Sequence, residues 1–359
     1  MTNKIINLFD SENNCNRLSV DEVIARKLNL YQNWTCGAGV KNIYIDYDGN
    51  VWKCNSASSM RVNSRNQRIL YTSDNLKKYA GYLGSIHSDF SIPTSWDTCP
   101  WQSCPCGADV LIPKAQPGYI DSLVSNGPND DNNRHNDRPS SNRFDKPVAV
   151  EPYFLVGKQL LWDIGRRCNF SCSYCWPGSH SNSEGFLDWT TIHATVNKVL
   201  NNWSNGTQIR WYFGGGEPTV HPKFIDWMKL LKDHNQWTLV TSNGSRPSKY
   251  WKELVPYLNG VNLSVHFEFI NEDKLIDNIQ VIADHYGKNE GWLEIKLMAT
   301  PDSLERAVAL KSYIAENNLL ISNDKIVGSL SLVPIRDLVV ASKLVDYTPE
   351  QQRLLETQV

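Results

Sequence analysis

The segment QLLWDIGRRCNFSCSYCWPG, residues 159–178, joins an apolar strand pattern to a loop with three closely spaced cysteines. We expect the strand over residues 159–164, so Cys168, Cys172 and Cys175, here called the cysteine triplet, follow its carboxyl end. Parallel α/β folds place their chemistry at that edge. Thiolates hold iron–sulfur clusters, and a cubane normally takes four of them. The triplet therefore predicts a [4Fe–4S] cluster with one iron open to another ligand.

A structural zinc ion is the alternative for the triplet. Zinc in such sites takes four protein ligands. The nearest further candidate, His180, lies beyond the Pro177–Gly178 pair. The spacing therefore favours the cluster over zinc.

From residue 150 onward, short apolar strands alternate with amphipathic helices, which is typical of parallel βα units. Besides the strand at 159–164, the pattern predicts strands over residues 208–213, 237–242, 262–267, 293–298 and 327–333. The stretches 188–203 and 271–286 carry apolar faces that we expect to pack on the sheet. Six units are too few for an eight-stranded barrel. The predicted fold class is α/β, with a partial (β/α)6 TIM-like barrel over residues 150–359.

The N-terminal part, residues 1–120, is predicted to form a smaller cysteine-rich domain. Its one convincing helix spans residues 19–28, with Ser19 as the cap. Residues 41–54 are predicted to form a β-hairpin that turns at Asp48–Gly49. Strand pairing in this region would bring Cys36 and Cys54 together.

Residues 121–149 are predicted to be a linker or mobile loop. The stretch 126–147 holds one aromatic and no aliphatic side chain, too little apolar surface to offset the entropy of ordering. A basic arm for nucleic acid is the alternative, but aspartates interleave with its arginines.

The charge balance excludes several kinds of partner. The chain has 36 basic and 38 acidic residues and a net charge of −2, so we expect neither nucleic acid nor an anionic membrane as a partner. The N-terminus has no signal-peptide core, and no apolar run is long enough to span a membrane. We expect a cytoplasmic protein, in which the clustered cysteines are ligands and not disulfides.

The C-x3-C-x2-C spacing, with Tyr174 before the last cysteine, resembles the signature of the radical S-adenosylmethionine (SAM) superfamily. In that family, SAM chelates the open iron through the amino and carboxylate groups of its methionine part. One electron from the cluster then yields a 5′-deoxyadenosyl radical, which takes a hydrogen atom from the substrate. The resemblance covers about residues 158–340.

The segment YFGGGEPT, residues 212–219, resembles the GGE motif of the same family. By that resemblance, two glycines approach the methionine amino group of SAM and Glu217 accepts from it. Polar residues at the third and fourth strand ends resemble further SAM contacts, although Ser264 and His266 are equally consistent with merely solvated positions. The implied SAM-binding residues are Tyr174, Gly215, Gly216, Glu217, Pro218, Ser242, Asn243, Ser264 and His266. The family's G-x-I-x-G-x-x-E element is not visible, so the adenine contacts on the fifth strand are unassigned.

A second group of cysteines resembles the auxiliary-cluster domain of SPASM and twitch proteins. In this chain the group precedes the barrel, whereas in those relatives it follows the barrel. Its members are Cys36, Cys54, Cys99, Cys104 and Cys106. Five cysteines suffice for one further [4Fe–4S] cluster, held by the first three and one of the last two, which favours the twitch type. Structural zinc is the alternative here.

The resemblance implies a radical SAM oxidoreductase that is served by a flavodoxin- or ferredoxin-type reductant. We favour a peptide or protein side chain as substrate, with a small alcohol or sugar as the alternative. The alternative from another class of protein is an iron–sulfur electron carrier. A carrier, however, needs neither Glu217 nor an open iron.

Overall fold

The computed structural model describes residues 5–9, 15–58, 81–100, 112–116, 149–152, 157–175, 180–204, 206–335 and 345–357. The chain divides into two compact units. The first contains Leu161–Val199 and Gln208–Val359, and the second contains Thr2–Leu160 and Leu200–Thr207. The predicted linker, apart from Ala149, and both Cys104 and Cys106 lie outside the described residues.

Six neighbouring strands form the sheet of the first unit, and the unit boundary falls within the first of them. In sheet order they are β10 (Lys158–Asp163), β11 (Ile209–Gly214), β12 (Trp237–Ser242), β13 (Gly260–His266), β14 (Trp292–Ala299) and β17 (Gly328–Pro334). The pairs from β11 to β17 are parallel. The six predicted strands are confirmed, with small shifts at their ends.

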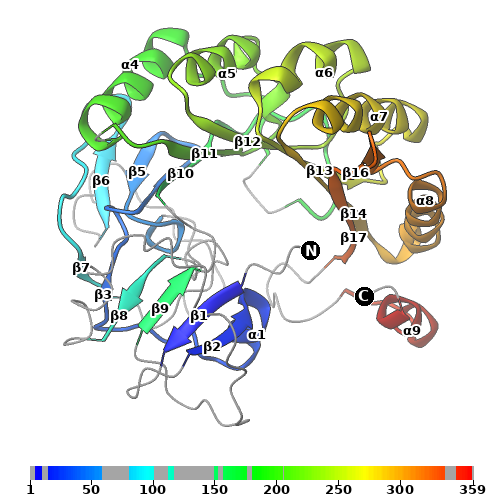
Figure 1. Ribbon diagram of the computed structural model, residues 1–359, viewed down its shortest axis with the longest axis horizontal. Helices are drawn as coiled ribbons and strands as arrows, with labels where there is room; N and C mark the ends of the chain where they lie inside the picture. Colours follow the sequence, from blue (N-terminus) through cyan, green and yellow to red (C-terminus); the bar gives the residue numbers. More distant parts are fainter. Residues whose placement is uncertain are drawn as a thin grey trace. The chain divides into compact units, whose positions relative to one another are not determined.

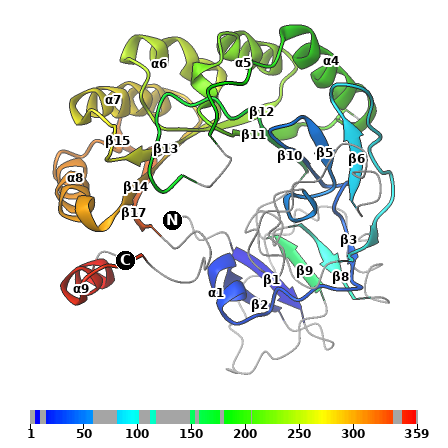
Figure 2. The same ribbon diagram turned by 180° about the vertical axis from the view of Figure 1, so that it is seen from behind.

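Helices cover the outer side of this curved row of strands, as Figures 1 and 2 show from opposite directions. They are α4 (Trp189–Val199), α5 (Phe224–Asp233), α6 (Ser248–Leu254), α7 (Glu272–Lys288) and α8 (Leu304–Glu316). A further helix, α9 (Pro349–Thr357), follows near the end of the chain. The predicted helix over 188–203 changes after Val199 into a π-helical turn, Leu200–Ser204. The predicted apolar faces of α4 and α7 are buried.

Residues alternate between buried and partly exposed along β13 and β14. Such alternation marks strands with one face against helices and the other face open. The register pairs Ser264 with Lys296 and His266 with Met298, so polar side chains of β13 gather on the open face. The unit is a mixed α/β fold with a large parallel sheet, consistent with the predicted partial TIM-like barrel.

An aromatic core fixes the first two strands of this sheet. Trp162 of β10 packs edge-on against Trp227 of α5 with ring centroids 4.6 Å apart. Phe213 of β11 lies 5.0 Å from the same Trp227 ring. All three side chains are buried, and each such ring pair adds about 0.5–1.5 kcal/mol beyond its area burial. The loops that leave β10 and β11 therefore start from rigid strands.

The second unit contains a sheet of short strands. In sheet order they are β2 (Cys15–Ser19), β1 (Ile5–Phe9), β9 (Ala149–Pro152), β8 (Lys114–Ala115), β3 (Thr35–Cys36) and β7 (Asp97–Thr98). Helix α1 (Val20–Ala25) is capped by Ser19, which forms a capping box with Glu22. The predicted cap is confirmed, but the helix ends before residue 28 because Lys27 adopts a φ of 56°.

The predicted hairpin is present as β4 (Asn42–Ile45) and β5 (Asn50–Trp52), which pair antiparallel, with β6 (Tyr82–Ser85) beside β5. Gly49 turns the chain at a φ of +75°. Asp46 is buried and accepts hydrogen bonds from the Asp48 and Asn50 amides, each 2.9 Å long. Burial raises the pKa of Asp46.

The strand that holds Cys36 is separate from the hairpin, and the closeness of Cys36 to Cys54 stays a prediction. Cys36 belongs to β3, whose partners are β7 and β8, so it lies opposite Asp97 on one side and Lys114 on the other. Cys54 instead follows β5.

No helix in the described part of the chain combines the length and the apolar character that a membrane crossing requires.

Candidate active site

The predicted site residues of the first unit follow successive strands of its sheet. The cysteine triplet follows β10, the glycine-rich turn ends β11, Ser242 and Asn243 end β12, and His266 ends β13. Because the carboxyl ends of parallel strands meet at one edge, the topology brings these segments together.

The glycine-rich turn packs against the backbone that leads into the triplet. Gly216 N donates to Gly165 O over 2.8 Å, and Glu217 N donates to Arg167 O over 2.8 Å. A Cβ atom on Gly216 would lie 2.2 Å from Arg167 O. Gly215 has a φ of +116°, which other residues rarely adopt. The approach of the two chain segments therefore requires both glycines.

The Glu217 side chain is 3% exposed and joins the turn to the end of β12. Its Oε1 accepts from Thr219 N (3.0 Å), Thr219 Oγ1 (2.5 Å) and Ser242 Oγ (2.8 Å), and its Oε2 accepts from Asn243 N (2.6 Å). Burial raises the pKa of Glu217, while these donors oppose the rise. Pro218 begins the short helix η4 (Pro218–Val220) that Glu217 caps. Oε2 is thus the oxygen with room for a further donor.

Asn243 connects Glu217 with the triplet. Its side-chain Nδ2 lies 3.8 Å from Cys168 Sγ and donates to Asn169 Oδ1 over 3.0 Å. Asn169 in turn donates to Ser245 Oγ over 2.8 Å. The structure therefore brings Cys168, Glu217 and Asn243 into one network.

Tyr174 and His266, both predicted SAM contacts, touch each other. Tyr174 Oη lies 3.0 Å from His266 Nδ1, and the two rings stack at 5.7 Å between centroids. Burial lowers the pKa of His266 to about 4, so its ring is neutral at pH 7, and burial raises the pKa of Tyr174. Ser264 lies two residues before His266 on the same face and forms no hydrogen bond with the other described site residues.

Glu268 is a site residue that the sequence interpretation missed. Ser173 N donates to Glu268 Oε2 over 2.7 Å, and Ser173 Oγ donates to Glu268 Oε1. Glu268 stands in the same strand-end stretch, NLSVHFE, as Ser264 and His266. Its position just after a strand was the available signal.

The triplet thiols suit a cluster. All three are partly buried, and Phe170 N donates to Cys168 Sγ over 3.4 Å, as donors to cluster sulfurs do. Burial raises the pKa of Cys168, and burial followed by the charges of Glu268, Cys168 and Cys175 raises the pKa of Cys172 to about 12. The thiolates therefore need a positive partner. No three metal-ligating side chains among the described residues are placed around a single ion. A cubane does not require the three thiolates to surround one ion, because each thiolate binds its own iron.

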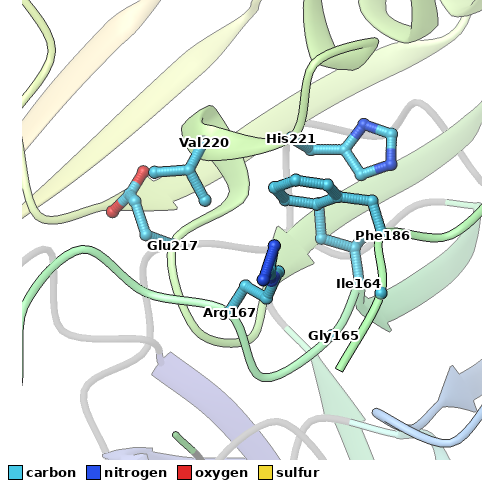
Figure 3. A pocket seen from close by; sticks show the side chains of 8 residues that line it. Ile164, Gly165, Arg167, Phe186, Glu217, Val220 and His221 are labelled. Atoms are coloured by element: carbon cyan, nitrogen blue, oxygen red, sulfur yellow. The ribbon is translucent and has the colours of Figure 1, made fainter. Parts of the chain in front are cut away.

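A cavity of about 250 Å³, which includes solvent at its mouth, lies beside the glycine-rich turn (Figure 3). The Arg167 guanidinium lies 4.8 Å from the Phe186 ring in its wall. The other lining residues are Ile164, Gly165, Gly185, Glu217, Val220 and His221. In Figure 3 the Glu217 carboxylate points away from Phe186 and His221. The carboxylate thus faces its β12 partners and not this cavity.

In the second unit, three of the predicted auxiliary ligands are buried. Cys36, Cys54 and Cys99 are 6%, 8% and 8% exposed. Cys99 directly follows β7, the strand that pairs with the strand of Cys36, and its amide donates to Trp34 O over 2.8 Å. Cys36 thus lies in one strand of a pair and Cys99 directly follows the other, while Cys104 and Cys106 lie outside the described residues.

Residues 162–294 match the sequence model of the Radical SAM superfamily. This range holds the triplet, the glycine-rich turn and the ends of β11, β12 and β13. This part of the chain is therefore similar to radical SAM enzymes. The similarity implies a [4Fe–4S] cluster and SAM as cofactors.

Curated relatives match only part of the chain. A tungsten-containing aldehyde ferredoxin oxidoreductase cofactor-modifying protein of Pyrococcus furiosus is 32% identical over 90 residues, 24% of each chain. A putative glycyl-radical enzyme activating enzyme of Methanocaldococcus jannaschii is 26% identical over 133 residues, 37% of this chain and 48% of its own. The chain thus spans about a quarter of the length of the first relative and about half of the length of the second.

Among solved structures, SuiB of Streptococcus suis bound to its precursor peptide SuiA is similar to this chain with a TM-score of 0.39 and 16% identity. The similarity covers 55% of this chain and 44% of SuiB.

Proposed function

We propose that this chain binds SAM at a [4Fe–4S] cluster held by the cysteine triplet and uses it to abstract a hydrogen atom from a substrate. One observation carries the proposal. The backbone N–H of Asn243 donates to Glu217, and the side chain of Asn243 lies beside Cys168. The segments that the family uses for cluster and SAM thus form one network. When bound, the cluster supplies the electron that cleaves SAM.

Glu217 and the two glycines would hold the methionine end of SAM. The glycines leave the backbone of the turn open, since neither carries a side chain. Glu217 Oε1 already accepts from three donors, whereas Oε2 accepts from Asn243 N alone. Oε2 would therefore accept the SAM ammonium, and Ser242 and Asn243 would keep the carboxylate in place.

His266 and Tyr174 would line the remainder of the SAM site. Because His266 is neutral at pH 7, its Nδ1 can accept from the Tyr174 hydroxyl when Nε2 carries the proton. Nε2–H is then a donor on the open face of β13, where Ser264 also lies. This arrangement orients the Tyr174 ring and supplies polar groups to a bound nucleoside.

The second unit is proposed to hold an auxiliary [4Fe–4S] cluster. Cys36, Cys54 and Cys99 would supply three thiolates, and Cys104 or Cys106 the fourth. The burial of the first three supports a ligand role, because a cluster is protected from water there. Structural zinc is the alternative metal for the same cysteines.

We infer a peptide or protein side chain as the substrate, because the cysteine pattern of the second unit resembles domains that accompany peptide-modifying radical SAM enzymes. A small alcohol or sugar is the alternative. A flavodoxin- or ferredoxin-type protein in the cytoplasm would supply the electron, and the clustered cysteines suit that reducing compartment.

The proposal is tested by anaerobic reconstitution followed by reduction with dithionite in the presence of SAM. Wild-type protein should hold about eight irons, four for each of two clusters, and should release 5′-deoxyadenosine. The triple alanine variant of the triplet should hold about four irons and release none. Cys15→Ala is the matched control, because Cys15 belongs to neither cysteine group. Production of 5′-deoxyadenosine by the triple variant would refute the assignment, and zinc in place of the remaining iron would refute the auxiliary cluster.

A further inference from the structure

Glu268 contacts the middle of the triplet loop from the end of another strand. Both oxygens of its carboxylate accept from Ser173, one from the amide over 2.7 Å and the other from the hydroxyl. Ser173 directly follows Cys172, although it lies 95 residues from Glu268 in the sequence. The carboxylate is therefore fixed beside the segment between the second and third cysteines.

Two uncharged neighbours of Glu268 in the sequence also contact the triplet loop. His266 contacts Tyr174, and Phe269 stacks on Phe170 with ring centroids 5.3 Å apart. The His266 ring is neutral at pH 7, because burial lowers its pKa to about 4. Of these supports, Glu268 alone places a formal charge against the loop.

The described structure contains no ion pair that neutralises this charge. Arg166 pairs with Glu184, and Arg306 pairs with Glu272. Both bonds to Glu268 come from neutral groups of Ser173. Glu268 is exposed, so water screens part of its field, but the hydrogen bonds keep the carboxylate at a fixed place.

A fixed negative charge at this place opposes any process that adds negative charge at Cys172. The carboxylate repels a thiolate at Cys172, because the residue next to Cys172, Ser173, holds it through two hydrogen bonds. A one-electron reduction of a cluster bound through Cys172 also adds one negative charge there. The same repulsion must therefore make the cluster harder to reduce.

We propose that Glu268 sets the reduction potential of the triplet cluster, lowering it with a fixed negative charge that Ser173 holds beside Cys172. The inference rests on the proposed function, since it requires that cluster. A lower potential makes the reduced cluster a stronger electron donor. Glu268 acts here through the cluster loop as a positioning residue and is not assigned a contact with substrate.

The test compares the full-length reconstituted protein with Glu268→Gln, Glu268→Asp and the control Asp273→Asn. Gln keeps the shape and loses the charge, whereas Asp keeps the charge. Asp273 is an exposed acid at the start of α7, in the segment that follows β13, and its variant removes one charge at a neighbouring place. Iron content and the midpoint potential of the SAM-responsive paramagnetic signal are measured, with dithionite as the electron donor.

We expect full iron in all four proteins and a raised midpoint potential in Glu268→Gln alone. An unchanged potential in Glu268→Gln with full iron would overturn the inference, as would an equal rise in Asp273→Asn. If Glu268→Gln loses iron, retention of iron by Glu268→Asp supports the need for charge, and equal loss in both overturns it. A wild-type protein without any SAM-responsive iron signal would instead overturn the proposed function, and this inference with it.

Discussion

Replacing Glu217 with Gln should destabilise the radical SAM domain even without cofactors. Each oxygen of the carboxylate faces one backbone N–H, Thr219 N at Oε1 and Asn243 N at Oε2. A Gln amide has one oxygen only, so either orientation of its side chain points an NH2 group at one of these N–H donors. The hydroxyls of Thr219 and Ser242 can rotate to accept from that NH2, but a backbone N–H has no such freedom.

The magnitude follows from one lost bond at a buried position. A hydrogen bond to a charged acceptor contributes about 1.5–3 kcal/mol, and a buried donor left unpaired costs about 1–3 kcal/mol. Because both descriptions concern the same N–H group, we expect a loss of about 2–3 kcal/mol in the free energy of unfolding. Ser242→Ala should also destabilise the domain, since Ser242 Oγ donates to Glu217 and accepts from the buried Gly244 N over 3.1 Å.

Urea unfolding at pH 7, followed by tryptophan fluorescence, measures this loss. Glu253→Gln is the control, because Glu253 is an exposed carboxylate on α6, and its change should stay within about 0.5 kcal/mol. In the reconstituted protein, Glu217→Gln should also weaken SAM binding by roughly 10- to 100-fold, as calorimetry would show. Stability equal to that of Glu253→Gln would refute the reasoning from the two N–H groups, and unchanged SAM affinity would refute the contact with SAM.

Two further predictions concern the same edge of the sheet. Gly216→Ala should lower the stability of the domain and block cluster assembly, because its Cβ would lie 2.2 Å from Arg167 O. Gly185→Ala is the control, because a Cβ there meets no atom within 4 Å, and it should change neither urea unfolding nor iron content. Burial lowers the pKa of His266 from 6.5 to about 4, although the Glu268 charge opposes this change. His266 therefore stabilises the native state above pH 6.5, and this stabilisation is lost as the pH falls towards 4. The loss in the free energy of unfolding is up to about 3 kcal/mol. Urea titrations of metal-free protein at pH 7 and pH 4.5 should show this acid loss in the wild type and a smaller one in His266→Gln; equal losses would contradict it.

Local pattern was enough to predict the scaffold. The six strands and the α4 and α7 faces appear where the apolar periodicity predicted them, because burial against a neighbouring layer imposes a period of 2 on strands and 3.6 on helices. The hairpin of β4 and β5 follows from Asp48–Gly49, since glycine reaches the positive φ of the turn at little cost. The Ser19 cap is equally local.

The sequence by itself thus determined the parallel sheet, the edge at which its chemistry gathers and the motifs at that edge. Tertiary structure alone decided which partners these residues meet. The Glu217 carboxylate turns to the end of β12, Glu268 reaches Ser173 from 95 residues away, and the strand of Cys36 pairs with β7 and β8. These contacts join residues distant in sequence, and strand order and register select them, which no short stretch of sequence encodes.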